Sequence, residues 1–200
     1  MDKLESLFVW GECQDCRLVV EGWNPWDEAR SPCPNCGSRS GLPWPGGPAE
    51  LLLDKAFAQN PEDYEDMATM GMLVTIALES MTEFLLASAI DSVGGCTPDN
   101  HRIMDAVLDS DLGVERRLKM IKAITGVDYR TVSRGLGERS FAADWERLRQ
   151  RRNQFVHRGE SCAFEPKSEL ELLSLSRAAI KVFAEVNNLM WGHNGWSPAH

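Results

Sequence analysis

Four cysteines near the amino terminus have the spacing of metal ligands. Cys13 and Cys16 form one Cys-x-x-Cys pair, and Cys33 and Cys36 form a second, with sixteen residues between the pairs. Four thiolates in two such pairs can close a tetrahedron around Zn²⁺, and this paired spacing seldom arises by chance. A site with four cysteine ligands leaves no position for water. We therefore expect one structural zinc ion per chain rather than a catalytic one.

Residues 1–47 are predicted to form a small zinc ribbon around this site. A short strand is expected at residues 18–20, which are apolar and β-prone. Acids outnumber bases in this segment, which disfavours a surface that follows phosphates. Its tryptophans are expected to form a miniature core or to contact a protein partner, and stacking on bases is the alternative. The Pro/Gly-rich residues 41–48 predict a linker to a second domain over residues 48–200.

The most concentrated positive region of the chain is the segment of residues 144–158, which belongs mostly to a predicted helix. Its apolar stripe runs from Phe141 through Trp145 and Leu148 and then continues into Arg152. A guanidinium at a core-facing position must pair with an acid or point into a cleft. Two carboxylates of an earlier apolar helix are the natural partners, although solvated carboxylates are the usual case. These two candidates are Glu79 and Glu83.

Three residues of this helix are candidates for catalysis. Asn153 and His157 are four residues apart and share a face, whereas Arg152 and His157 point about 140° apart on an ideal helix. Arg152 and His157 converge only if the helix end unwinds near Gly159 or if a ligand lies across a groove. The helix offers three further cations for substrate binding: Arg149, Arg151 and Arg158. Solvation beside Glu146 is the competing interpretation for the arginines before Arg152.

The rest of the chain is predicted to be helical. Apolar residues at intervals of three and four favour helices over about residues 49–59, 61–93, 98–108, 114–125, 140–157 and 166–190. Residues 127–139 are expected to form a polar loop. The second helix is apolar on more than one face, so we expect burial on two sides, one of which could be another subunit. The fold class is therefore all-α, a helical bundle preceded by a small ribbon.

Composition limits the classes of function. The formal net charge is −9, and an acidic protein does not coat nucleic acid nonspecifically, so any RNA site must be a local basic patch. The first ten residues lack the apolar core of a secretion signal, and no long uncharged apolar stretch is evident. We expect a cytoplasmic protein without a membrane partner. Outside the helix predicted over residues 140–157, the sequence pattern suggests no partner for the remaining histidines, which are expected at the surface. They are His101, His193 and His200.

In its helical surroundings, Arg152-Asn153-x-x-x-His157 resembles the Arg-x(4–6)-His motif of HEPN domains, in which a polar residue commonly follows the arginine. The long apolar helix before the motif and the closing helix after it are also similar, so the resemblance covers about residues 49–191. It implies a HEPN-like bundle and a homodimer whose motif helices face each other across a composite site. In many members it implies RNA cleavage without a metal. It also points to toxin, phage-defence or RNA-processing roles.

The resulting hypothesis is a metal-independent endoribonuclease that acts on single-stranded RNA. His157 would exchange the proton, Arg152 would stabilise phosphoryl charge, and Asn153 would orient the phosphate or His157. A protein partner or an antitoxin would bind through the ribbon. Two alternatives stay open. One is a non-catalytic HEPN module that binds RNA or a nucleotide. The other is a structural dimerisation protein in which an acid of its own core neutralises Arg152.

Overall fold

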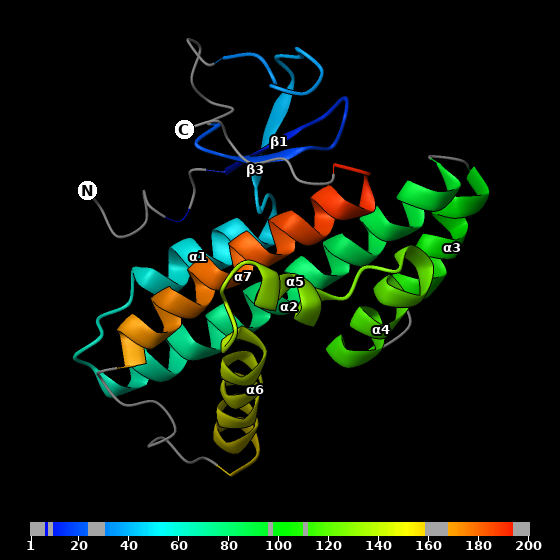
Figure 1. Cartoon of the computed structure of the whole chain (residues 1–200). Coiled ribbons are helices and arrows are strands. Elements are labelled where there is room, and N and C mark those ends of the chain that lie inside the picture. Colours follow the sequence, from blue (N-terminus) through cyan, green and yellow to red (C-terminus); the bar gives the residue numbers. More distant parts are fainter. Residues whose placement is uncertain are drawn as a thin grey trace.

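The structure, a computed structural model of the 200-residue chain, describes residues 7, 10–23, 31–95, 98–109, 112–158 and 168–193. A small sheet with cysteine-bearing turns lies at one end of a helical body (Figure 1). The predominance of helix confirms the coarse prediction from periodicity. Gly159 and His200 lie outside the described residues, as does the side chain of His101.

Three short antiparallel strands form the sheet, which we call the cysteine ribbon (residues 10–44). They are β1 (Trp10–Cys13), β2 (Val19–Glu21) and β3 (Gly41–Trp44), in the order β2-β1-β3. β3 corrects the expectation of a linker over residues 41–48. Pro43 is opposite Gly11 in an edge strand, where its missing N–H can face outward. A Cβ on Gly41 would lie 2.8 Å from the Trp23 ring, so close packing requires glycine there.

Seven helices follow within the described residues. They are α1 (Pro48–Phe57), α2 (Tyr64–Gly94), α3 (Pro98–Asp109), α4 (Val114–Thr125), α5 (Tyr129–Gly135), α6 (Phe141–Arg158) and α7 (Ser168–Met190). Most lie within a few residues of the predicted positions. Helix α5 replaces the expected polar loop. Its start is fixed by Asp128, whose side chain accepts a hydrogen bond from the Arg130 amide. Asp63 in turn caps α2 by accepting from the amides of Glu65 and Asp66.

Helix α2 is the central element of the bundle. Helices α1, α4, α6 and α7 all pack against it, and its predicted apolar stripe is fully buried. Its several apolar faces are therefore largely covered by the same chain, although Ile76, Phe84 and Val93 remain exposed. It is the one described helix that is long and apolar enough to cross a membrane, but most of its apolar window is buried, as in the core of a globular protein.

Helix α6 starts in the core and ends away from it. Phe141, Trp145 and Leu148 are buried, whereas Phe155, two turns after Leu148, is only half-buried. Phe141 and Trp145 stack with ring centroids 5.7 Å apart, and both meet Phe183 of α7 edge-on. Figure 1 shows α6 projecting from the layer formed by α2 and α7. The carboxyl-terminal half of α6, which carries the candidate motif, is thus presented to solvent.

Candidate metal centre and candidate active site

The four predicted ligands meet at one point of the cysteine ribbon. Their sulfur atoms all lie within 4.8 Å of one another, with Cys13 Sγ 3.5 Å from Cys36 Sγ and Cys16 Sγ 3.7 Å from Cys33 Sγ. A tetrahedron with metal–sulfur bonds of about 2.3 Å has edges of about 3.8 Å. The sulfur cage therefore has the size of a four-thiolate metal site. It fits a metal ion that takes tetrahedral sulfur coordination.

The two cysteine pairs have the same local geometry. In the first turn the Arg17 amide donates to the Cys13 carbonyl at 2.8 Å, and in the second the Gly37 amide donates to the Cys33 carbonyl at 2.8 Å. Arg17 and Gly37 also share a left-handed backbone, with φ of 62° and 76°. Glycine adopts this conformation freely, whereas arginine does so at a cost. Two matched turns that each present two sulfurs are the local basis of the cage.

One side of the cage is sheltered from water, whereas Cys16 is partly exposed and Cys36 is exposed. Cys13 and Cys33 are buried beside Leu18, Val20 and Trp23. Burial raises the pKa of the Cys33 thiol to about 12, and hydrogen bonds from backbone amides offset this only in part. A thiolate at this position therefore needs a nearby positive charge, which a bound metal ion supplies.

A buried carboxylate belongs to Glu12, the residue before the first cysteine. Glu12 is 3% exposed, and burial raises its pKa to about 7, although the Arg17 charge opposes the shift. Arg17 Nε lies 3.0 Å from Glu12 Oε1, but the two are not aligned for a hydrogen bond. The same guanidinium lies over the rings of Phe84 and Trp191, with distances of 6.0 and 5.7 Å to their centroids. Arg17 thus connects the first cysteine turn to α2 and to the end of α7.

The end of α7 holds the ribbon through side chains that the sequence pattern did not single out. Asn188 accepts from the Val19 amide at 2.7 Å and donates to the Val19 carbonyl at 3.0 Å, while Asn187 donates to the Arg17 carbonyl at 2.8 Å. His193 Nε2 lies 2.7 Å from the Cys16 carbonyl oxygen. The expectation that His193 is a surface residue without a partner is therefore wrong. The sulfur cage and the bundle therefore form one packed unit.

On α6, Arg152 faces inward and pairs with Glu79 of α2. The Nη2–Oε1 distance is 3.0 Å, and the side chains are 29% and 22% exposed. This confirms the expected partner, while Glu83 pairs instead with Arg117 of α4 at 2.6 Å. The Arg152 guanidinium is neutralised by its neighbour but still reaches solvent. It is therefore not sealed within the core.

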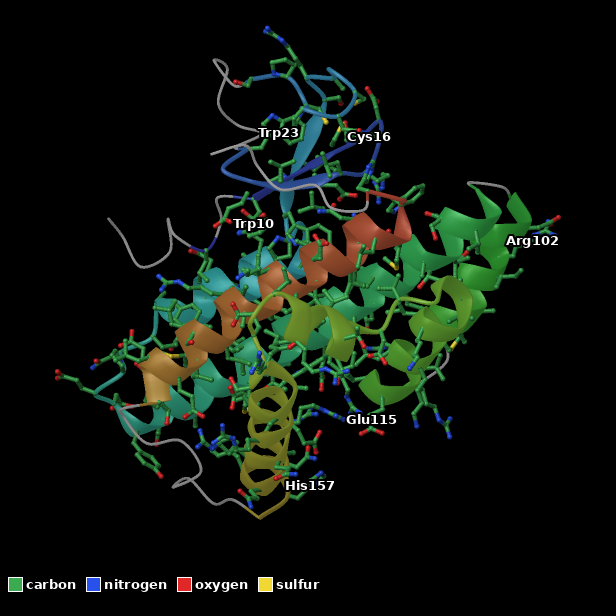
Figure 2. The ribbon with its side chains drawn as sticks, in the orientation of Figure 1. Trp10, Cys16, Trp23, Arg102, Glu115 and His157 are labelled. Carbon is green, nitrogen blue, oxygen red and sulfur yellow. The ribbon has the colours of Figure 1, made fainter. Side chains whose placement is uncertain are left out.

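Asn153 and His157 are both exposed near the end of α6, where Figure 2 labels His157. The helix is regular through Arg158, so no unwinding precedes that residue. Arg152 and His157 accordingly point about 140° apart, and the described chain does not bring them together. The side chain of Arg158 lies outside the described part of the structure. A shared site for Arg152 and His157 therefore requires a ligand or a second copy that bridges them.

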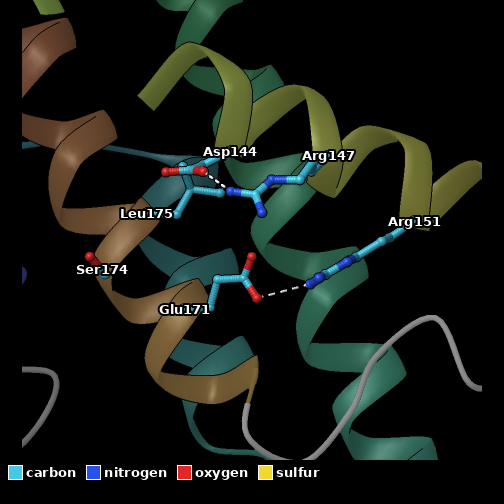
Figure 3. Close-up of a pocket in the computed structure, with 6 residues that line it drawn as sticks. All are labelled: Asp144, Arg147, Arg151, Glu171, Ser174 and Leu175. Atoms are coloured by element: carbon cyan, nitrogen blue, oxygen red, sulfur yellow. Dashed lines mark hydrogen bonds and ion pairs between the residues drawn. The ribbon is translucent and has the colours of Figure 1, made fainter. Parts of the chain in front are cut away.

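The three other arginines of α6 whose side chains the structure describes are paired with carboxylates. Arg147 pairs with Asp144, Arg149 with Glu146 at 3.2 Å, and Arg151 with Glu171 of α7 at 3.0 Å. The first and last of these pairs line an open cavity of about 380 Å³ between α6 and α7 (Figure 3). Exposed ion pairs of this type are weak and exchange readily for other partners. Carboxylates therefore neutralise these arginines of α6 in the free protein, and a phosphate could replace a carboxylate beside them.

No protein-family model, curated protein or solved structure matches this chain. The inferences about function therefore rest on the residues and their geometry.

Proposed function

We propose that this protein is a metal-independent endoribonuclease of the HEPN type that acts as a homodimer on single-stranded RNA. The proposal is supported chiefly by one arrangement on α6. A partly exposed arginine is held in place by a partly exposed carboxylate of α2, and Asn153 and His157 follow it on the projecting end of the same helix. Arginine suits a phosphate and histidine titrates near neutral pH, so both are suited to cleavage of a phosphodiester.

The reaction follows from these groups. An imidazole removes the proton of a ribose 2′-OH, whose oxygen attacks the adjacent phosphorus. The bond from phosphorus to the 5′-oxygen breaks, and a protonated imidazole supplies a proton to that oxygen. The products are a 2′,3′-cyclic phosphate and a 5′-OH. Arg152 stabilises the charge on the phosphoryl oxygens, and Asn153 orients the phosphate.

A dimer supplies the second imidazole that this reaction needs. One chain has one motif histidine, and a two-fold axis beside α6 would bring His157 from two copies to one substrate. Exposed apolar side chains lie one turn from each member of the Arg152–Glu79 pair: Ile76 on α2 is 41% exposed and Val156 on α6 is 53% exposed. An interface there would bury both side chains and face the two motif helices toward each other.

The metal in this proposal is structural zinc. Cys13, Cys16, Cys33 and Cys36 form a closed sulfur cage, and Zn²⁺ is the common ion for four cysteines in this spacing. The ribbon then serves to stabilise the chain and to offer a surface for a protein partner, such as an antitoxin. Trp23 and Trp44 support this role because both are buried, which leaves neither ring free to stack on a base.

Cleavage assays with purified protein test the nuclease proposal. The zinc-loaded protein should cut unstructured RNA in buffer without Mg²⁺ or any other added divalent ion, and the products should carry 2′,3′-cyclic phosphates. His157→Ala should lower the rate by at least about 10²-fold, because it removes the proton-transfer group. Gln154→Ala, also exposed on α6, is the matched control and should cleave like the parent. Undiminished cleavage by His157→Ala would exclude this site as the source of activity.

A second candidate is a non-catalytic interaction module with the same fold. The observation that favours it is the pairing of the α6 arginines with carboxylates, which leaves little unpaired positive charge on the described part of this helix. RNA binding without any cleaved product, in protein of verified dimeric state, would support this candidate over the nuclease.

A further inference from the structure

A cleft between α4, α5 and α6 takes no part in the reaction proposed above. It consists of two adjoining cavities of about 410 and 200 Å³ that share Glu115, Leu118, Tyr129 and Arg130 as lining residues. Trp145 and Arg149 of α6 line the smaller cavity. Pockets for small ligands have volumes of about 300–1,000 Å³. The cleft is therefore large enough for one nucleotide.

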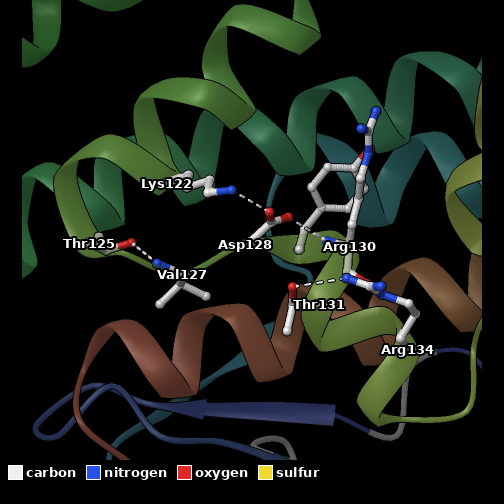
Figure 4. A network of polar contacts seen from close by, with 8 residues as sticks. Lys122, Thr125, Val127, Asp128, Arg130, Thr131 and Arg134 are labelled. Atoms are coloured by element: carbon white, nitrogen blue, oxygen red, sulfur yellow. Dashed lines mark hydrogen bonds and ion pairs between the residues drawn. The ribbon is translucent and has the colours of Figure 1, made fainter.

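The cleft carries a small positive excess in a chain whose net charge is −9. The charged lining residues are Lys119, Lys122, Arg130 and Arg149, with Glu115, Asp128 and Glu146 as the acids. Two of the acids already pair with cations, Asp128 with Lys122 at 2.7 Å (Figure 4) and Glu146 with Arg149 at 3.2 Å. The unpaired remainder is two bases against one acid. One excess charge matches the single negative charge of a phosphodiester unit.

Unsatisfied donors connect this cleft to the candidate active site. Trp145 is 2% exposed, and its Nε1–H has no hydrogen-bond partner among the described residues. The same is true of the Nε–H groups of Arg149 and Arg152. These residues follow one another at intervals of four and three, so their donors lie along one face of α6 at steps of about 5.4 Å per turn. Buried donors without partners are rare, and this face favours a ligand rich in acceptors.

We propose that the cleft binds one nucleotide of the RNA strand whose scissile phosphate lies at Arg152 and His157. The inference rests on the function proposed above and adds a second point of contact with the substrate. The base packs against the half-buried ring of Tyr129, and phosphate oxygens accept from Arg130 and Arg149. Only an unpaired base can enter a cleft of this size, so the site selects single-stranded RNA.

An RNA strand that reaches from the cleft to the candidate active site would run along α6. Trp145 and Arg149 lie in the wall of the cleft, Arg152 lies one turn beyond, and His157 lies at the exposed end of the helix. Figure 2 labels Glu115, which lines the cleft, and His157. A strand bound along this face would displace Glu146 from Arg149 and Glu79 from Arg152. Both ion pairs are partly exposed, so replacing each carboxylate by a phosphate costs little free energy.

Binding of an RNA that cannot be cleaved tests this proposal. A fully 2′-O-methylated single-stranded oligonucleotide lacks the attacking hydroxyl, and its affinity can be measured by fluorescence anisotropy. Arg130→Gln should weaken binding about tenfold, since it removes a charged donor from an exposed position. Trp145→Phe removes the Nε1–H together with one of the two indole rings and keeps one aromatic ring in the core, and it should weaken binding about threefold. Arg102→Gln on α3 makes the same charge change away from the cleft and should bind like the parent.

The outcomes separate this inference from the nuclease proposal. Parental protein that cleaves RNA, with unchanged oligonucleotide affinity in Arg130→Gln and Trp145→Phe, would overturn the cleft site alone. Cleft-dependent binding without cleavage of ordinary RNA would overturn the nuclease and retain the cleft. If the parent binds no RNA, both fail. Should Trp145→Phe unfold, Arg130→Gln still decides, because its side chain lies outside the core.

Discussion

Arg152 has two conceivable roles, as a structural cation and as a contact to phosphate, and a charge reversal separates them. Its pair with Glu79 is partly exposed, so it should contribute about 1 kcal/mol to folding. We predict that Arg152→Glu and Glu79→Arg each destabilise the protein by about 1–2 kcal/mol, because each places like charges together. The double variant should regain most of that loss in urea unfolding and yet stay inactive on RNA, since residue 152 would then repel phosphate.

Recovered cleavage in the double variant would count against a phosphate contact by Arg152. Asp144→Arg combined with Arg147→Glu is the matched control, because it reverses an ion pair on α6 whose arginine is not a candidate for substrate binding. It tests whether any reversed ion pair on α6 abolishes activity.

Glu12 should give the protein a measurable dependence on pH. Its pKa rises from 4.5 to about 7 on folding, mainly because of burial, so the folded state holds its proton more tightly than the unfolded state. The contribution of Glu12 to stability is therefore greatest at low pH and falls as pH rises toward 7. Between about pH 5.5 and about pH 8 the loss should be of the order of 2 kcal/mol.

Urea unfolding of the parent and of Glu12→Gln at both pH values measures this effect. The glutamine keeps the shape and cannot ionise, so the difference in stability between the two proteins should change with pH by that amount. Both carry the same four cysteines, so a pH-dependent metal affinity that they share cancels. A constant difference would show that the Glu12 carboxylate ionises as easily in the folded chain as in the unfolded one.

At the scale of single residues, helical spacing predicted neighbours but not distant contacts. The stripe Phe141, Trp145, Leu148 placed Arg152 inward, and an apolar helix with two glutamates supplied its partner. Asn188 was missed because its partner, Val19, is 169 residues away and no periodicity connects a helix end to a strand backbone. The partners of His193 escaped notice for the same reason.

At the scale of elements, burial decided which predictions held. Helix α2 was predictable because the residues that face its neighbours are apolar at every turn. Helix α5 was not, because only Val132 and Ser133 of its seven residues are buried and its sequence is mostly polar. Strand β3 was not predicted because its proline and glycine favoured a linker. Both residues are compatible with an edge strand, since one side of such a strand has no neighbour.

The attachment of β2 to α7 should depend strongly on Asn188. This side chain is buried and satisfies both backbone groups of Val19, so Asn188→Ala leaves a buried N–H and a buried C=O without partners. We predict a loss of about 2–4 kcal/mol in the free energy of unfolding by urea. Asn153→Ala, the same change at an exposed asparagine, should cost less than about 0.5 kcal/mol. Equal effects of the two variants would mean that this attachment does not stabilise the fold.

At the scale of the whole molecule, the contacts between ribbon and bundle imply that the two unfold together. Trp44 packs edge-on against Phe84 of α2 with centroids 5.1 Å apart, and Ser88 of α2 receives the Trp191 indole N–H at 2.8 Å while it donates to Asn187 at 2.8 Å. Polar and aromatic contacts therefore run from the cysteine turns to the central helix. A metal ion that orders the turns also orders the surface on which α7 ends.

Removal of the metal should accordingly lower the stability of helices that do not touch it. Circular dichroism in the far ultraviolet reports almost entirely on α1–α7, because the described part of the ribbon contributes three short strands and no helix. We predict that a strong chelator lowers the melting temperature of this helical signal by about 5–15 °C, the shift expected for a loss of a few kcal/mol in a chain of this length. Added Zn²⁺ should restore it. Cys13→Ser with Cys36→Ser should melt like the chelated parent, and chelator should cause no further shift in that variant. If neither the chelator nor the cysteine substitutions change the melting temperature of the helical signal, the ribbon and the bundle are energetically independent despite their contacts.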